Sequence, residues 1–309
     1  MTPHQLLYEK KKKRIRLNGI FYAVLSSASF GFSPLFSLGL VGVLTNADIL
    51  SYRWGLAGIV LMIYAFCKKK SLRPNSFDEV WKIVLLSALR ALTSVTLLIG
   101  YANISSGIAS TINFMYPVIV AICMMFIFGE HKSPIDIIAI AVSIFGVFLL
   151  ASGDSLVVEG GNTKLGLTCS LISAFSFAAY YILMKRLRAD KIEVVKFTTW
   201  IMILSAVYFL VWAIGFEGGL TMIPDGRSWL LILGLALWST MVSNFTGVKA
   251  VRRIGPTMTS ILGALQPVTA VILGVVFLNE HLYLKSLIGI VLILVAVTIV
   301  VMHQSRRKH

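Results

Sequence analysis

The chain has 309 residues, of which 57% are hydrophobic and only 13% are charged, whereas a soluble domain carries about 25% charged residues. Its mean hydropathy of +0.86 excludes a disordered chain and a water-soluble enzyme, because neither accommodates so much apolar surface. The formal net charge of +15 does not indicate nucleic-acid binding, since the basic residues lie in short tracts between apolar runs. We therefore expect an all-α integral membrane protein with the lipid bilayer, and no nucleic acid, as a partner.

Ten apolar segments are each long enough to cross a bilayer as a helix, which takes about 20 residues. The first follows the basic tract from Lys10 to Arg16 and is too long for a signal-peptide core, so we expect it to stay uncleaved. In chain order the segments are 18–43, 48–67, 81–101, 107–128, 134–152, 165–186, 195–215, 229–250, 257–278 and 284–303.

A Gly-rich polar linker divides these segments into five and five. The expected organisation is a cytoplasmic basic tail (1–17), a first five-helix unit (18–153), an extracytoplasmic linker (154–164), a second five-helix unit (165–303) and a cytoplasmic tail (304–309).

The distribution of Lys and Arg predicts the orientation of the chain. With the N-terminus in the cytoplasm, 23 of the 28 basic residues fall on the cytoplasmic side and three on the opposite side. The remaining two, Arg53 and Arg90, lie inside predicted spans. Cytoplasmic loops are enriched in Lys and Arg. We therefore expect a multi-pass protein of the cell (inner) membrane with both termini in the cytoplasm.

The two halves share a sequence repeat at an offset of 150 residues. A matched proline and a matched Glu-His pair are rarer by chance than matched apolar residues. Because each half has an odd number of spans, the second half crosses the membrane in the opposite sense, and such inverted repeats are typical of alternating-access transporters. The matched positions are Ile104, Ser110, Pro117, Val118, Ile122, Glu130 and His131 with Ile254, Ser260, Pro267, Val268, Ile272, Glu280 and His281.

The segments GIASTINFMYPVIVAICMMFIFGE (107–130) and TMTSILGALQPVTAVILGVVFLNE (257–280) resemble the ten-helix EamA-type members of the drug/metabolite transporter superfamily. The resemblance covers nearly the whole chain. It implies a cavity lined by helices 1, 3, 4, 6, 8 and 9, and the carriage of metabolites, amino acids or drugs. The first span contains no acid, so the proton antiport of the four-helix multidrug exporters cannot be transferred to this chain.

Arg90 is the most informative polar residue. It lies nine residues, or about 14 Å, into the third span, where a guanidinium is costly unless it faces a polar cavity. It would either anchor a substrate carboxylate or phosphate, or bond to exposed backbone carbonyls. Arg53, nearer the end of its span, is interpreted as an interfacial anchor or a partner of Asp48.

Other polar side chains and three prolines are candidates for the same site. Prolines within helices remove a backbone hydrogen bond and kink the helix, so we expect the kinks and the site to coincide, with simple packing as the alternative. The candidate substrate-binding residues are Arg90, Asn113, Tyr116, Tyr180, Trp238, Asn244 and Gln266, and the candidate hinges are Pro34, Pro117 and Pro267.

Glu130 and Glu280 precede helices on opposite sides of the membrane, so they cannot form one catalytic or metal site. We interpret both as structural or gate residues that favour a helix N-terminus. The three cysteines have no metal-binding or redox spacing, and we expect no cofactor, no metal and no catalytic residues.

We therefore expect a secondary transporter of small, amino-acid-like or other organic solutes, with export as the expected direction. None of the 13 acids lies deep in a span, which favours uniport or exchange over proton antiport. A weakly coordinated Na⁺ remains an alternative, as do a lipid-modifying membrane enzyme, a channel and a scaffold. A monomer or weak homodimer is expected.

Overall fold

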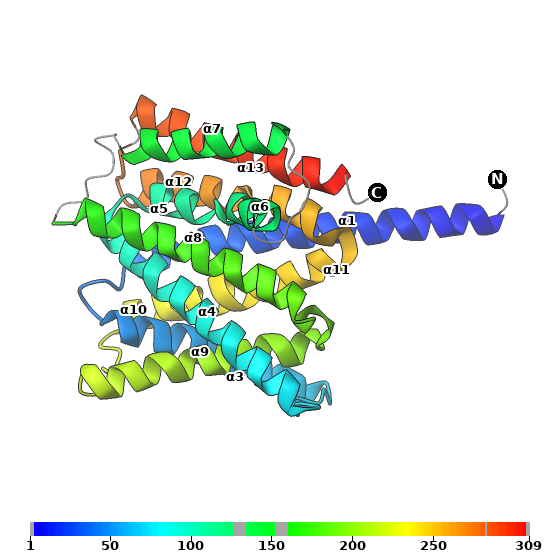
Figure 1. Ribbon diagram of the computed structural model, residues 1–309. Coiled ribbons are helices and arrows are strands. Elements are labelled where there is room, and N and C mark those ends of the chain that lie inside the picture. The colour runs from blue at the N-terminus through cyan, green and yellow to red at the C-terminus, as the bar shows by residue number, and fades with distance from the viewer. Residues whose placement is uncertain (1–2, 127–133, 152–159, 282, 307–309) are drawn as a thin grey trace.

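The structure is a computed structural model, and it describes residues 3–126, 134–151, 160–281 and 283–306. All regular secondary structure in these residues is helical, apart from an isolated bridge between Val41 and Leu44. The helices form one elongated bundle, in which α1 begins and α13 ends at the same end (Figure 1). We call this the termini end and the opposite one the far end.

The helices, in chain order, are α1 (Pro3–Gly31), α2 (Ser33–Leu38), α3 (Asn46–Cys67), α4 (Phe77–Asn103), α5 (Ser106–Asn113), α6 (Tyr116–Phe126), α7 (Pro134–Ala151), α8 (Thr163–Arg186), the short 3₁₀ turn η2 (Ala189–Lys191), α9 (Val194–Phe216), α10 (Gly226–Leu233), the π-helix η3 (Gly234–Val242), α11 (Ser243–Leu262), α12 (Leu265–Phe277) and α13 (Leu284–Arg306).

Six helical stretches of the described chain are long and apolar enough to cross a membrane: Arg14–Leu38, Asn46–Cys67, Phe77–Asn103, Thr163–Arg186, Val194–Phe216 and Gly226–Ile254. Shorter apolar helices lie at Ser106–Val120, Ile137–Gly146, Leu265–Phe277 and Leu284–Ile299. Large apolar side chains such as Phe21, Phe66, Phe148 and Ile214 are exposed on the outside of the bundle. This combination confirms an all-α membrane protein, whereas the count of ten spans stays a prediction.

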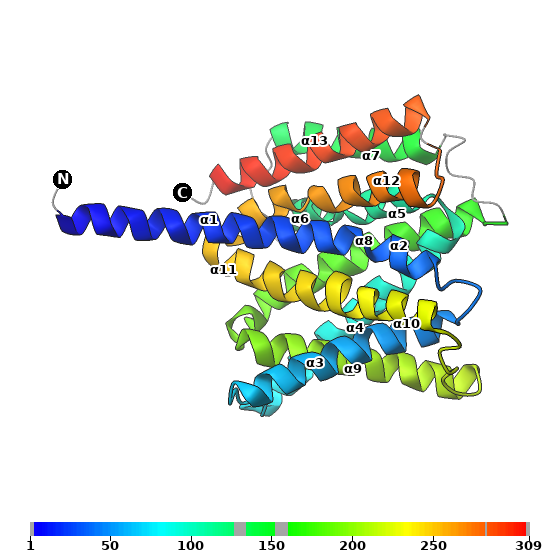
Figure 2. The same cartoon turned by 180° about the vertical axis from the view of Figure 1, so that it is seen from behind.

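The helices pack in pairs that are far apart in sequence. α1 lies along α11, and α4 lies along α8; α3 pairs with α9, α5 with α12 and α7 with α13 (Figures 1 and 2). Two of these approaches depend on glycine. A Cβ on Gly19 would collide with Ile254, and a Cβ on Gly166 would collide with Ile104. Elements of the first half of the chain thus hold those of the second half, and the reverse.

Several predicted boundaries differ from the structure. The basic tail predicted at 1–17 is helical from Pro3 as part of α1, because Lys and Arg are good helix formers and extend a helix that the apolar span already nucleates. The span predicted at 229–250 continues through η3 and α11 to Leu262. The ninth predicted span, 257–278, is consequently shared between the end of α11 and α12.

Two polar contacts fix the ends of the bundle. At the termini end, Lys196 Nζ lies 3.1 Å from Glu79 Oε1, and both side chains are buried. At the far end, Asp48 completes a capping box with Thr45 at the start of α3. Its other oxygen, Oδ1, accepts a 3.0 Å hydrogen bond from Thr221 N. These buried carboxylates are satisfied by neighbouring elements, as burial of charge requires.

Candidate functional site

A cavity of about 170 Å³ lies between α1, α4, α6, α8, α9, α11 and α12. It begins at the buried Arg90 in the middle of the bundle and extends past Met184 to Ala189 and Ile192, which connect α8 to α9 at the termini end. The exposed Arg252 also lines it, so the cavity reaches the surface at this end.

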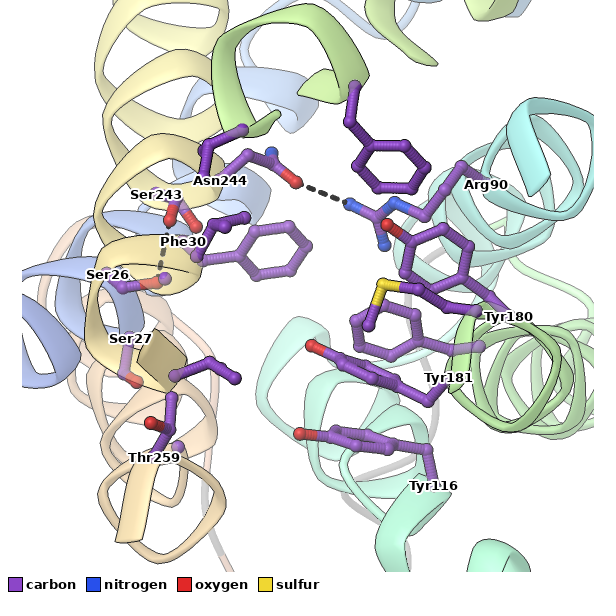
Figure 3. Close-up of a pocket in the computed structure, with 18 of the residues that line it drawn as sticks. Ser26, Ser27, Phe30, Arg90, Tyr116, Tyr180, Tyr181, Ser243, Asn244 and Thr259 are labelled. Carbon is purple, nitrogen blue, oxygen red and sulfur yellow. Dashed lines mark hydrogen bonds between the residues drawn. The ribbon is translucent and has the colours of Figure 1, made fainter. Parts of the chain in front are cut away.

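The two sides of the cavity differ in chemistry (Figure 3). One side carries small hydroxyl groups, which come from Ser26, Ser27 and Thr259, among others. The other carries aromatic rings, and Tyr116 stacks on Tyr181 with ring centroids 5.2 Å apart. Three tyrosine hydroxyl groups, from Tyr116, Tyr180 and Tyr181, point from this side into the space (Figure 3). A solute in the cavity would therefore meet apolar ring faces and many hydrogen-bonding groups.

Arg90 is the charged group at the inner end of the cavity. It lies 13 residues after Phe77 in the 27-residue helix α4, near its middle. The side chain is only 4% exposed. Its guanidinium lies 4.7 Å from the ring centroid of Phe177 and 5.5 Å from those of Tyr180 and Trp54. Such rings stabilise a cation without neutralising it.

The hydrogen bonding of Arg90 also leaves its charge uncompensated. Arg90 Nη2 donates to the neutral amide oxygen of Asn244, Oδ1, at 3.2 Å (Figure 3). Among the described residues, no carboxylate lies within ion-pair distance of Arg90. A guanidinium in this setting is a binding group for a carboxylate or phosphate that enters the cavity.

Five of the seven predicted substrate-binding residues line this cavity: Arg90, Tyr116, Tyr180, Asn244 and Gln266. The other two lie outside its wall. Asn113 is buried, and its Oδ1 accepts a 3.1 Å hydrogen bond from Ser173 Oγ. Trp238 is 43% exposed and packs edge-on against Phe32.

The predicted hinges lie at breaks between helices. α5 ends at Asn113 and α6 begins one residue before Pro117; α11 ends at Leu262 and α12 begins two residues before Pro267. Pro34 is in the first turn of α2, after the break that follows Gly31. The carbonyl of Gly263, four residues before Pro267, accepts a 2.9 Å hydrogen bond from Gln266 N, so the missing donor of the proline does not leave this carbonyl open.

Glu280 joins two segments that are distant in sequence. Its Oε2 accepts from Ser105 Oγ at 2.7 Å and its Oε1 accepts from Ser106 N at 2.7 Å, so it caps the N-terminus of α5. The predicted partner was the following helix, α13, but Asn279, with a φ of 54°, turns the chain back after α12. Asn tolerates this left-handed conformation. Glu130 lies outside the described residues.

Arg53 is not the interfacial anchor that its distance from the helix end indicated. It is 4% exposed, its Nε donates to Thr240 Oγ1 at 2.6 Å, and it does not contact Asp48 as an ion pair. The guanidinium lies 5.8 Å from the ring centroids of both Phe30 and Trp54. Arg53 thus points into the bundle, because α3 is enclosed there by α9 and η3.

Sequence reasoning missed other residues of the cavity wall. Phe177 and Tyr181 lie one helical turn apart on the same side of α8 as Tyr180. Their i, i+4 spacing could have predicted that both aromatic side chains face the cavity together. Ser26 and Ser27 begin the run SSASFGF (26–32), which SAFSFAA (173–179) echoes in the second half. Among the described residues, no three His, Cys, Asp or Glu side chains gather as a metal site would require.

Comparisons with known proteins identify related chains over most of this length. The profile of the EamA-like transporter family matches residues 17–152 and 164–302. A WAT1-related protein of Arabidopsis thaliana is 24% identical over 295 residues, which are 86% of this chain and 79% of that protein. The uncharacterized transporter YetK of Bacillus subtilis is 23% identical over 257 residues, 82% of this chain and 78% of YetK.

A solved crystal structure shares the fold, with a TM-score of 0.65 at 15% identity. The match covers 96% of this chain and 99% of that one. At this identity the likeness supports the architecture of the bundle alone.

Proposed function

Since the chain belongs to the EamA-like transporter family, and is therefore a multi-pass membrane transporter rather than an enzyme, we propose that it is a secondary transporter of small organic anions. Its substrates are amino-acid-like or other small metabolites that carry a carboxylate or a phosphate. The observation that carries this proposal is Arg90: it is buried, it lines the cavity, and its described partners are all neutral.

The energetic cost of Arg90 supports a functional role. A guanidinium near the bilayer midplane costs about 2.5–3.5 kcal/mol on insertion scales. The single hydrogen bond to Asn244 and the aromatic rings around Arg90 offset part of this cost. A bound carboxylate or phosphate would complete the compensation through a charge-assisted, bidentate contact.

The remaining lining residues suit the uncharged part of such a substrate. Tyr116, Tyr180 and Tyr181 offer hydroxyl groups as well as apolar faces, and Gln266 and Ser26 add further polar groups. The site for the substrate in this proposal is the cavity wall, with Arg90, Tyr116, Tyr180, Asn244 and Gln266 as its contacts. Asn113 and Trp238 support the surrounding helices.

The proposed architecture is ten spans in two inverted five-helix halves, 18–153 and 165–303. The helix pairs support it, since Gly19 of the first half meets Ile254 of the second, and Gly166 of the second meets Ile104 of the first. In an inverted repeat, a contact from the first half to the second is matched by a corresponding contact from the second half to the first.

The π-helix accounts for a change of offset between the halves. The N-caps of α4 and α10, Ser76 and Asp225, are 149 positions apart, whereas Pro117 and Pro267 are 150 apart. An i→i+5 turn holds one residue more than an α-helical turn. η3 lies between these points and accommodates the additional residue.

The proposed orientation has the termini end in the cytoplasm, because 23 of 28 basic residues then lie on that side. In this conformation the cavity communicates with the termini end, and contacts such as that of Glu280 with Ser105 and Ser106 close the far end. Alternating access would exchange the open and closed ends by rocking the two halves, with Pro34, Pro117 and Pro267 near the bending points.

The proposed energy source is the gradient of the substrate itself, through uniport or exchange. The described residues that line the cavity include no Asp, Glu or His, which are the groups that relay protons in membrane proteins. Export from the cytoplasm is the proposed net direction.

Counterflow in proteoliposomes tests the proposal. An organic anion inside the vesicles should accelerate uptake of the labelled anion from outside, since a carrier exchanges faster than it returns empty. Flux that does not saturate and is insensitive to internal anion would indicate a channel instead. Uphill accumulation driven by an imposed pH or Na⁺ gradient would contradict uniport and exchange.

A further inference from the structure

A second buried arginine lies close to the first. Arg53, seven residues after Asn46 in α3, is as buried as Arg90, and the guanidinium groups of both lie against the indole of Trp54, at 5.8 and 5.5 Å. Among the described residues Arg53 also has no carboxylate within ion-pair distance. Its charge serves no ion pair there, although burying it is as costly as burying Arg90.

Thr240 and Asn244 link the two arginines through their side-chain and backbone hydrogen bonds. Arg53 Nε donates to Thr240 Oγ1 at 2.6 Å, Asn244 Nδ2 donates to the Thr240 carbonyl at 2.7 Å, and Arg90 Nη2 donates to Asn244 Oδ1 at 3.2 Å. Thr240 belongs to η3, and Asn244 follows it in α11. Single π-helical turns within α-helices are frequent at functional sites. The π-helix therefore connects the two charged groups through neutral partners.

The position of Thr240 relates Arg53 to Arg90 through the repeat. At the offset of 150 residues, Thr240 is the counterpart of Arg90. Arg53, which also belongs to the first half, brings its guanidinium to Thr240, so a cation lies at each of these two corresponding positions. In an inverted repeat, corresponding places exchange their environments when the transporter changes from one open end to the other.

Of the two buried arginines, Arg90 lines the cavity in this conformation and Arg53 does not. Phe30 lines the cavity, and its ring centroid lies 5.8 Å from the guanidinium of Arg53. Arg53 lies nearer the far end of the bundle, seven residues after the start of α3. Opening of the far end would give a solute access to Arg53, just as the cavity of the present conformation gives a solute access to Arg90.

We propose that Arg53 is a second anion-binding residue, which takes the carboxylate or phosphate of the substrate when the far end is open. The two arginines then bind the same charged group in turn. This inference rests on the proposed function, because it assigns a second step to the same substrate.

Modification of arginines by phenylglyoxal, read by mass spectrometry of the peptides, tests this proposal with inorganic phosphate as the probe. Purified wild-type protein is compared with Glu280→Gln, which weakens the contacts that close the far end. Arg90 should react in both proteins, and Arg53 should react about tenfold faster in Glu280→Gln, because the loss of one charge-assisted contact shifts a two-state equilibrium by about this factor. Phosphate should slow both reactions, and glycerol at the same concentration should slow neither.

A structural role of Arg53 is tested by Thr240→Val in the Glu280→Gln background. This substitution removes the described partner of Arg53 Nε and leaves the charge. Protection of Arg53 by phosphate should persist if the guanidinium itself binds the anion, and its loss with normal protection of Arg90 would contradict direct binding.

Two outcomes separate this inference from the proposed function. Protection of Arg90 alone, or an Arg53 that reacts in neither protein, would overturn the second site and leave the anion transporter intact. A lack of protection at both arginines would overturn the proposed function itself.

Discussion

Arg90 and Arg53 are the two buried arginines among the residues that the structure describes, and they differ in access rather than in burial. Both are 4% exposed, both lie against Trp54, and each donates to a neutral side chain of η3 or α11. Only Arg90 lines the cavity that reaches the termini end. The comparison teaches that burial of a charge in a carrier does not by itself identify a substrate contact, since access depends on which end is open.

The largest expected effect is that of Arg90→Ala on transport. Loss of a charge-assisted contact worth about 1.5–3 kcal/mol weakens binding by about 10- to 150-fold, so counterflow should nearly disappear while the protein still inserts. Arg90→Lys should retain part of the activity, since it keeps the charge without the bidentate geometry. Arg252→Ala is the matched control: it removes a cation at the mouth and should mainly slow association. Unchanged counterflow kinetics in Arg90→Ala would contradict the claim that Arg90, unlike Arg53, binds the substrate in this conformation.

Arg53→Ala should separate turnover from binding. We expect the maximal rate of counterflow to fall about tenfold, because the anion then has no cationic partner when the far end is open. Binding from the termini end, measured as ligand-induced stabilisation in detergent, should stay within about twofold of wild type, since Arg90 is intact. An Arg53→Ala protein that loses binding and turnover equally would place both arginines in one site.

Glu280→Gln should change the distribution of open ends. The carboxylate binds Ser105 Oγ and Ser106 N, and in the proposed mechanism these contacts hold the far end closed. We expect labelling of a cysteine introduced at Ser105 to accelerate about tenfold, on the scale of a charge-assisted hydrogen bond. Glu217→Gln, an exposed acid at the end of α9, is the control. Equal labelling of both variants would show that Glu280 does not hold the far end closed.

The smallest expected effect is that of the helix breaks. Pro117→Ala together with Pro267→Ala restores a backbone donor to each of α6 and α12. We expect turnover to fall about threefold with little loss of thermal stability, because the breaks ease rocking of the halves rather than holding the fold. Wild-type turnover in the double variant would reduce both prolines to packing residues.

Much of the fold follows from the sequence because the bilayer restricts the possible structures. Apolar runs of about 20 residues must be helices there. Arg90 was predicted from depth alone, since a mid-span guanidinium needs a polar cavity. The faces of the helices were harder to predict. Trp238 lies within η3, where the additional residue per turn rotates the helix face, and its ring packs outside the cavity wall.

Hydrogen-bond partners that are distant in sequence were equally hard to predict. Glu280 precedes α13, yet it binds Ser106, 174 residues away. Arg53 lies near the end of a predicted span, and its depth gave no sign that Thr240 of another helix would receive it. Such contacts depend on how the two halves pack together, and the local spacing of residues in one sequence does not reveal this packing.

The most direct test of the account is a thermal-shift screen of small carboxylic acids and phosphate esters, each paired with its uncharged amide or alcohol, on wild-type protein and Arg90→Ala. The account predicts that the compounds that stabilise the wild type are anions, that their uncharged partners are inactive, and that Arg90→Ala loses the stabilisation. Stabilisation of both proteins by the uncharged partners would contradict the claim that Arg90 binds the charged group of the substrate.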